Sequence, residues 1–291
     1  MLTSPTLNIE FERAINKIYS FDHGNTIALV AGDTSTQIML CDRTNTGLKP
    51  EMVVADVAAA YASEYARLRQ TRNERTHLTP LGLTTETFAE ATGAMSPVLA
   101  MQLANDLKWD RLGCEALICG TDRHGAHIFV VNDPGLVDCA DNVGFAAIGI
   151  GAPHAETILM DARYTRNEPL STALLLLYTA KRRAEVAPGV GLDTDIVLLS
   201  PFGAPRSVPV SPHIVNQLGN IYADQKQTVA QAQGTAREAI DKFIAQIFTP
   251  PMLPPGSAPG APGEAGPSSS TPDPSGPPPS PGSDESPSPA S

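Results

Sequence analysis

Gly32 and Asp33 stand where an apolar segment gives way to a polar one, and this change predicts an anion-binding turn. The apolar run 27–31 has the length of a buried strand and ends at Gly32. Asp33 and the three hydroxyl residues after it suit the N-cap and first turn of a helix. The first N–H groups of a helix have no partner within it, so they attract a negatively charged oxygen. The glycine also suits a strand-to-helix turn with an unusual φ, and the two roles are compatible.

Histidine and cysteine are two further residue types with metal-binding or nucleophilic chemistry. His124 and His127 flank a predicted hairpin tip without an obvious third ligand, so we expect surface histidines rather than a metal pair. The four cysteines have neither zinc-site spacing nor the density of a disulfide scaffold, and we expect reduced, mostly buried thiols. The sequence contains no phosphate-binding or dinucleotide-binding glycine motif. We therefore expect no metal and no cofactor.

The elements that must position these residues follow from hydrophobic periodicity and turn signals. We expect a strand at 27–31, helices from Asp33 and over 52–75, and a helical stretch 85–108 broken near Gly93 and Pro97. Two strands, 114–119 and 127–131, are joined by a turn-rich segment and predict a hairpin. The remaining expectations are a strand at 143–150, helices at 152–160 and 170–186, a strand at 195–199 and a helix at 213–248.

Six motifs occur in an order that resembles one known family. They are Ile-Asn-Lys-Ile-Tyr at 15–19, Ile-Ala-Leu-Val-Ala-Gly-Asp at 27–33, Glu-Ala-Leu-Ile-Cys-Gly-Thr-Asp at 115–122, the Gly-Phe to Gly-Ala segment 144–152, the apolar helix 171–186, and Asp-Thr-Asp-Ile-Val-Leu at 193–198. Between Ala14 and Ser200 the sequence is similar to proteasome β-type subunits and related bacterial peptidases, which are N-terminal-nucleophile (Ntn) hydrolases. The resemblance implies an α+β fold with four layers, an αββα sandwich.

The resemblance assigns two candidate catalytic residues. Lys17 matches the catalytic lysine, because Asn-Lys-Ile-Tyr stands here for the usual Lys-Lys-Ile-Tyr. A lysine that ends a loop beside a local carboxylate such as Glu12 explains the same position equally well. Gly32 matches the glycine whose N–H helps to form the oxyanion hole, which agrees with the anion-binding turn above.

Other positions depart from the catalytic pattern of that family. The Gly-Ser-Gly motif is here Gly149-Ile150-Gly151, and isoleucine forms no side-chain hydrogen bond. The segment 187–191, where the family has an acid and a serine, carries neither a hydroxyl nor a carboxylate. The family's nucleophile is a threonine at the first position of the mature chain, on a strand upstream of the lysine motif. Alignment on that motif predicts an N-terminally truncated domain without the first hairpin, and neither Thr3 nor Thr6 is terminal.

Two functions therefore stay open. In the first, the full-length form is a threonine-type peptidase or amide hydrolase, and this chain is inactive as written. In the second, the chain is a non-catalytic ring or scaffold subunit of a self-compartmentalising assembly. Both imply a homo-oligomer, which we expect to associate through the helices at about 33–75, and the first implies a peptide or protein substrate.

Composition sets the remaining expectations. The net charge of −11 and the shortness of the basic run at 181–183 argue against nucleic acid as a partner. The N-terminus lacks a secretory signal pattern and the apolar runs are too short to span a bilayer, so we expect a cytoplasmic protein without membrane contact. The sequence predicts one domain over 1–248 and a disordered Pro/Gly/Ser-rich tail over 249–291.

Overall fold

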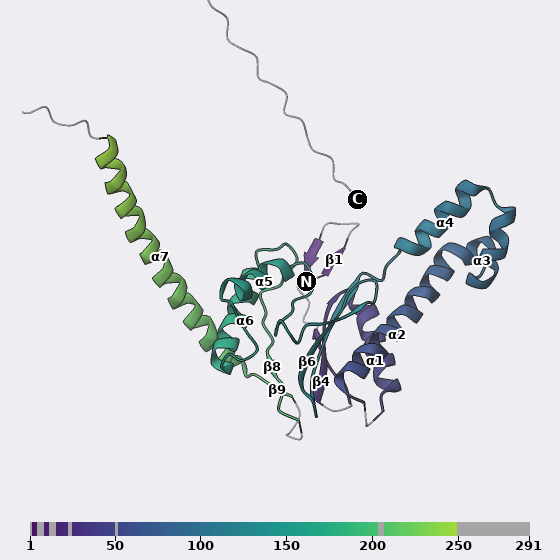
Figure 1. Ribbon diagram of the computed structural model, residues 1–291, viewed down its shortest axis with the longest axis horizontal. Helices are drawn as coiled ribbons and strands as arrows, with labels where there is room; N and C mark the ends of the chain where they lie inside the picture. Colours follow the sequence, from purple (N-terminus) through teal and green to yellow (C-terminus); the bar gives the residue numbers. More distant parts are fainter. Residues whose placement is uncertain are drawn as a thin grey trace, which may run out of the picture. The chain divides into compact units, whose positions relative to one another are not determined.

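A five-stranded antiparallel sheet forms the centre of the fold, with strand order β3-β4-β5-β6-β7 (Figure 1). The computed structural model describes residues 2–4, 9–11, 16–22, 25–49, 52–202 and 207–248. Residue contacts divide the chain into two compact units, Met1–Gly234 and Thr235–Ser291, and the sheet belongs to the first. Its strands are β3 (Ile18–Ser20), β4 (Asn25–Gly32), β5 (Cys114–Asp122), β6 (Gly125–Val131) and β7 (Val137–Cys139).

The register of β4 against β5 fixes which side chains enter the core. All of β4 pairs with β5, from Asn25 opposite Thr121 to Gly32 opposite Cys114. Because successive side chains of a strand point to opposite faces, Ala28 and Ile118 share one face, and both are fully buried. The predicted hairpin is confirmed, since β5 and β6 meet in a tight turn between Asp122 and Gly125.

Helices α1 (Thr34–Gly47) and α2 (Val54–Asn73) cover that face of the sheet (Figure 1). Their inward residues, Leu40, Val57, Tyr61 and Tyr65, are 0–1% exposed and pack in the same cluster as the strand residues. Full burial of an apolar side chain of this size contributes roughly 1.5–3 kcal/mol. Burial of these side chains against the sheet therefore holds both helices in place.

The remaining helices confirm most of the expected pattern. A π-helical turn (Glu74–Leu78) continues α2, and the predicted break separates α3 (Thr85–Ala91) from α4 (Pro97–Trp109). Helices α5 (Ala152–Asp161) and α6 (Leu170–Ala184) pack against each other, as Figure 1 shows. The last helix is α7 (Pro212–Phe248). Two further strand pairs are short: β1 (Leu2–Ser4) with β2 (Ile9–Phe11), and β8 (Val197–Leu198) with β9 (Val208–Pro209).

The predicted strand at 143–150 is wrong, because this segment forms turns and irregular structure. Gly144 and Gly149 adopt φ values of +84° and +82°, which interrupt an extended run. The strand that follows the Pro134-Gly135 turn is instead β7, which pairs with the second half of β6. The strand expected at 195–199 is reduced to the two residues of β8.

At the coarse level the expected α+β class is correct, since a mixed fold of helices and sheet is present. The four-layer arrangement and the domain boundary at residue 248 stay predictions, and the predicted tail, 249–291, lies outside the described residues. Within the described ranges, no helix combines the length and apolar character needed to cross a membrane.

Candidate functional site

The turn from β4 into α1 has the geometry that the sequence predicts. Gly32 has φ +103°, and a Cβ at this position would lie 2.1 Å from the carbonyl oxygen of Gly113. Asp33 is the N-cap of α1, and its carboxylate accepts hydrogen bonds from the hydroxyl and the backbone N–H of Thr36. The hydroxyl bond is the main cause that lowers the pKa of Asp33. The carboxylate therefore stays ionised and occupied with the helix start.

The structure brings the backbone of Lys17 near Gly32, at one end of the paired strands β3 and β4. The N–H of Val30 donates to the carbonyl oxygen of Lys17 over 3.0 Å. Because N–H groups alternate in direction along a strand, the N–H of Gly32 points to the β3 side of β4, as that of Val30 does. The N–H groups of Val30 and Gly32 are two residues apart along β4, which is roughly 7 Å. The backbone of Lys17 and the N–H of Gly32 are therefore neighbours.

The side chain of Lys17 is exposed, and no hydrogen bond or ion pair among the described residues involves its ammonium group. Glu12, the local carboxylate that offers the alternative explanation, lies outside the described residues. Both explanations of Lys17 therefore stay open. Thr3 lies in β1, paired with Glu10, and Thr6 also lies outside the described residues.

The sheet face away from α1 and α2 carries a carboxylate that the sequence did not single out. Glu115 is the cross-strand partner of Ala31, and its Oε2 accepts a hydrogen bond from the N–H of Gly149 over 3.0 Å. A Cβ on Gly149 would lie 3.1 Å from the Cβ of Ala31, so this loop contacts the end of β4 directly. The available sequence signal was Glu115 itself, a charged residue at the start of an apolar strand. Its partner, Gly149, is far away in sequence.

The next residue in that loop, Ile150, has 73% of its surface exposed. Isoleucine offers no side-chain hydrogen bond at this position.

Gln37 is a second residue that sequence reasoning missed. Its amide nitrogen donates to the carbonyl oxygens of Ala31 (2.8 Å) and Glu115 (2.9 Å), and its amide oxygen accepts from the hydroxyl of Tyr61 (2.6 Å). Gln37 is 1% exposed. It thereby ties α1 and α2 to the strand ends that carry the Gly32 turn. A polar residue on the buried face of a predicted helix was the available signal.

Two of the four cysteines, Cys41 and Cys114, are buried, whereas Cys119 is half-buried and Cys139 is exposed. The first three are poor nucleophiles. Burial raises the pKa of Cys41, Cys114 and Cys119 to about 12, so their thiols stay protonated at neutral pH. Within the part of the chain that the structure describes, no group of three or more His, Cys, Asp or Glu side chains is arranged to hold a metal ion.

The prediction of two surface histidines is correct for His124 and wrong for His127. The side chain of His127 is only 20% exposed, and both of its ring nitrogens contact carboxylates.

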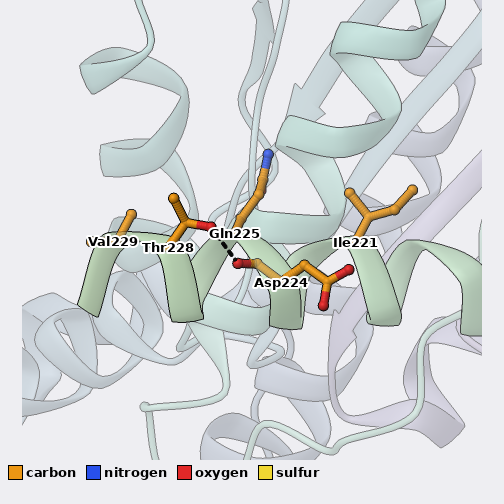
Figure 2. Close-up of a pocket in the computed structure, with 5 residues that line it drawn as sticks. All are labelled: Ile221, Asp224, Gln225, Thr228 and Val229. Atoms are coloured by element: carbon orange, nitrogen blue, oxygen red, sulfur yellow. Dashed lines mark hydrogen bonds between the residues drawn. The ribbon is translucent and has the colours of Figure 1, made fainter. Parts of the chain in front are cut away.

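A surface hollow of about 480 Å³ lies along α7, away from any predicted site residue (Figure 2). It is lined by Ile221, Asp224, Gln225, Thr228 and Val229. The hydroxyl of Thr228 donates to the carbonyl oxygen of Asp224 within the helix. These five residues include one carboxylate and no base to pair with it, so the hollow does not supply a catalytic pair.

Comparison with known proteins supports the fold. No protein-family model matches the chain, and no curated protein matches its sequence. The solved structure of Anbu (ancestral beta-subunit) from Yersinia bercovieri is similar, with 14% identity, 75% of this chain and 84% of that chain covered, and a TM-score of 0.50. At the coarse level, the fold is proteasome-like. A Gly-1 mutant of Anbu from Hyphomicrobium sp. strain MC1 gives 14% identity, 74% and 84% coverage, and a TM-score of 0.49. A likeness at this identity concerns the fold alone.

Proposed function

We propose that this chain is a proteasome-like β-type subunit of the Ntn-hydrolase family whose full-length form cleaves amide bonds in peptides or proteins. The observation that carries the proposal is the closeness of the Lys17 backbone to the end of β4, where the N–H of Gly32 precedes a helix N-terminus. A tetrahedral intermediate carries an oxyanion, and an N–H fixed by a rigid turn stabilises it without reorganisation. A cytoplasmic location belongs to the same proposal.

In this mechanism the nucleophile is a terminal threonine whose own amine accepts the hydroxyl proton. The Lys17 ammonium eases that proton transfer through its positive charge, and the Gly32 N–H receives the developing negative charge. We place the threonine on a strand of a second sheet, opposite the face that bears Glu115. The full-length domain then has the four layers that the resemblance implies.

A non-catalytic subunit is the second candidate, and Ile150 favours it. The exposed isoleucine and the hydroxyl-free segment 187–191 leave the usual support for a nucleophile incomplete. On this alternative the fold serves assembly, and Lys17 and Gly32 have structural roles only.

Peptide hydrolysis separates the two candidates. On the first candidate, a longer form that carries the terminal threonine should cleave fluorogenic peptides. In that form Lys17→Ala should lower kcat by roughly 100-fold or more, the scale of general acid–base assistance.

Lys49→Ala is the matched control, since Lys49 is also an exposed lysine on a connecting segment. Equal losses in the two variants would remove Lys17 from the mechanism. A longer form that is folded but inactive, or the absence of any such form, would support the non-catalytic subunit instead.

Self-association through α2 is part of the proposal. Ala55, Ala59 and Ala66 lie on the exposed side of the helix, whereas Ala58 is fully buried and Ala62 packs partly into the core. Of the five alanines at 55, 58, 59, 62 and 66, three therefore remain fully available for close helix approach.

Light scattering tests this association. At tens of micromolar we expect a mass above that of the monomer, and Ala59→Glu should shift it toward the monomer by placing a charge in the contact. Ala104→Glu, at an exposed position of α4, should leave the mass unchanged. A strict monomer before any substitution, or equal effects of both substitutions, would contradict the association through α2.

A further inference from the structure

His127 in β6 lies between two carboxylates. Its Nδ1 is 2.7 Å from Oδ2 of Asp141, and its Nε2 is 3.2 Å from Oδ1 of Asp122. The Asp122 side chain is 9% exposed and the other two are 20% exposed, so water reaches this cluster only in part. The ring also stacks near Phe129, with 6.1 Å between centroids, on the sheet face that α2 covers.

Each carboxylate also holds a backbone N–H of a different element. Oδ2 of Asp122 accepts from Val54, the first residue of α2, over 3.1 Å, and its Oδ1 accepts from the N–H of His124 over 2.7 Å. Oδ1 of Asp141 accepts from Ile128 in β6 over 2.8 Å. The cluster thus joins the N-terminus of α2, the β5–β6 turn and the exposed edge of β6.

The two carboxylate contacts of the His127 ring require a proton on each ring nitrogen. A carboxylate only accepts hydrogen bonds, whereas a neutral imidazole donates one and accepts one. With carboxylate oxygens at both nitrogens, the imidazolium satisfies both contacts. The neutral ring leaves one nitrogen lone pair facing a negative oxygen, which is repulsive.

The surrounding charges agree with this geometry. Burial lowers the pKa of His127, but the hydrogen bond to Asp141 and the charges of both carboxylates outweigh it, so this pKa lies above the ordinary imidazole value. Burial raises the pKa of Asp122 and Asp141, yet the backbone N–H donors and His127 bring both below the ordinary value. Other ionisable groups on the elements next to the ring are Arg123 and His124 on the turn, Cys119 in β5, Cys139 in β7 and Asp56 in the first turn of α2.

We propose that His127 is a pH-dependent clamp, closed as the imidazolium, that ties the start of α2 and the β6 edge to the β5–β6 turn. A group whose pKa is raised by folding stabilises the native state below its unfolded pKa, about 6.5 for histidine. That stabilisation is lost as the pH rises through the folded pKa of His127. Above it, the clamp loosens while the rest of the sheet stays folded.

Backbone hydrogen exchange followed by NMR tests the clamp directly, because the Val54 and Ile128 amides donate to its two carboxylates. Rates are expressed as protection factors, which removes the ordinary acceleration of exchange by base. As the pH rises from about 5.5, below the ordinary imidazole value, through the raised pKa of His127, we expect both protection factors to fall severalfold. They should share one midpoint that matches the imidazole titration of His127. Protection of Ala28, in the interior strand β4 away from the clamp, serves as the reference for any change in global stability.

Two substitutions and one control complete the experiment. His127→Gln should flatten the pH dependence at both amides, and Asp141→Asn should move the His127 midpoint to lower pH. His154→Gln, an exposed histidine in α5, should behave as the unsubstituted chain. Flat protection at Val54 and Ile128 in the unsubstituted chain, or a His127 midpoint at or below about 6.5, would overturn the proposal whether or not the variants fold.

Discussion

Gly32→Ala should destabilise the chain by about 3 kcal/mol or more, from the sum of a left-handed backbone strain and a steric clash. The φ of +103° is unfavourable for any residue with a Cβ, and the new Cβ would lie 2.1 Å from the Gly113 carbonyl oxygen. That neighbour is backbone, and the N–H of Asp33 holds it at 3.1 Å. The strand end therefore has to move. Urea denaturation with the extrapolated free energy of unfolding measures the effect.

Two other glycines separate the contributions. Gly82 has φ +71°, but no atom lies within 4 Å of the position that a Cβ would take, so Gly82→Ala reports backbone strain alone. That strain is about 1 kcal/mol. Gly47 lies in the last turn of α1 with open space around it, so Gly47→Ala should stabilise by about 0.5 kcal/mol. A Gly32→Ala variant no less stable than Gly82→Ala would show that the clash relaxes, and that the turn is less rigid than an oxyanion hole requires.

The sequence predicted this turn because its signals are local. An apolar run, a glycine and an N-cap aspartate occupy adjacent positions, so no long-range contact is needed to interpret them. The same reason explains why the β5–β6 hairpin and the helices were predicted correctly. The strand prediction for 143–150 failed, although the apolar residues of this segment suit a strand. Its backbone is determined by Gly144 and Gly149, whose φ values depend on distant contacts.

The contacts around the candidate site were not predictable in this way. Glu115 meets Gly149 across 34 positions of sequence, and His127 meets Asp141 across 14. Each pair is determined by strand register and by the path of a loop. A polar residue in an apolar pattern marks where such a contact exists, but it does not name the partner. Gln37, Glu115 and His127 are three such residues.

Gln37→Leu should have the second large effect, about 2–4 kcal/mol of lost stability. Leucine has a similar size but removes both hydrogen bonds to the carbonyl oxygens of Ala31 and Glu115. It also leaves the hydroxyl of Tyr61, which is 1% exposed, without its acceptor. Leaving a donor buried without an acceptor accounts for much of the loss, because water reached that donor in the unfolded chain. Urea denaturation at neutral pH again gives the free energy of unfolding.

A double-mutant cycle with Tyr61→Phe assigns the cause. Removing the hydroxyl from the Gln37→Leu variant also removes the unsatisfied donor, so the double variant should recover about 1 kcal/mol relative to Gln37→Leu. Additive losses would mean that the cost comes from the two carbonyl contacts instead. Either result bears on the candidate site, since these carbonyls belong to Ala31 and Glu115, which flank the Gly32 turn and the Gly149 loop. The free energy of unfolding of Gln37→Leu could instead lie within about 0.5 kcal/mol of that of the unsubstituted chain, which is the size of an ordinary surface effect. In that case Gln37 does not fix that end of the sheet.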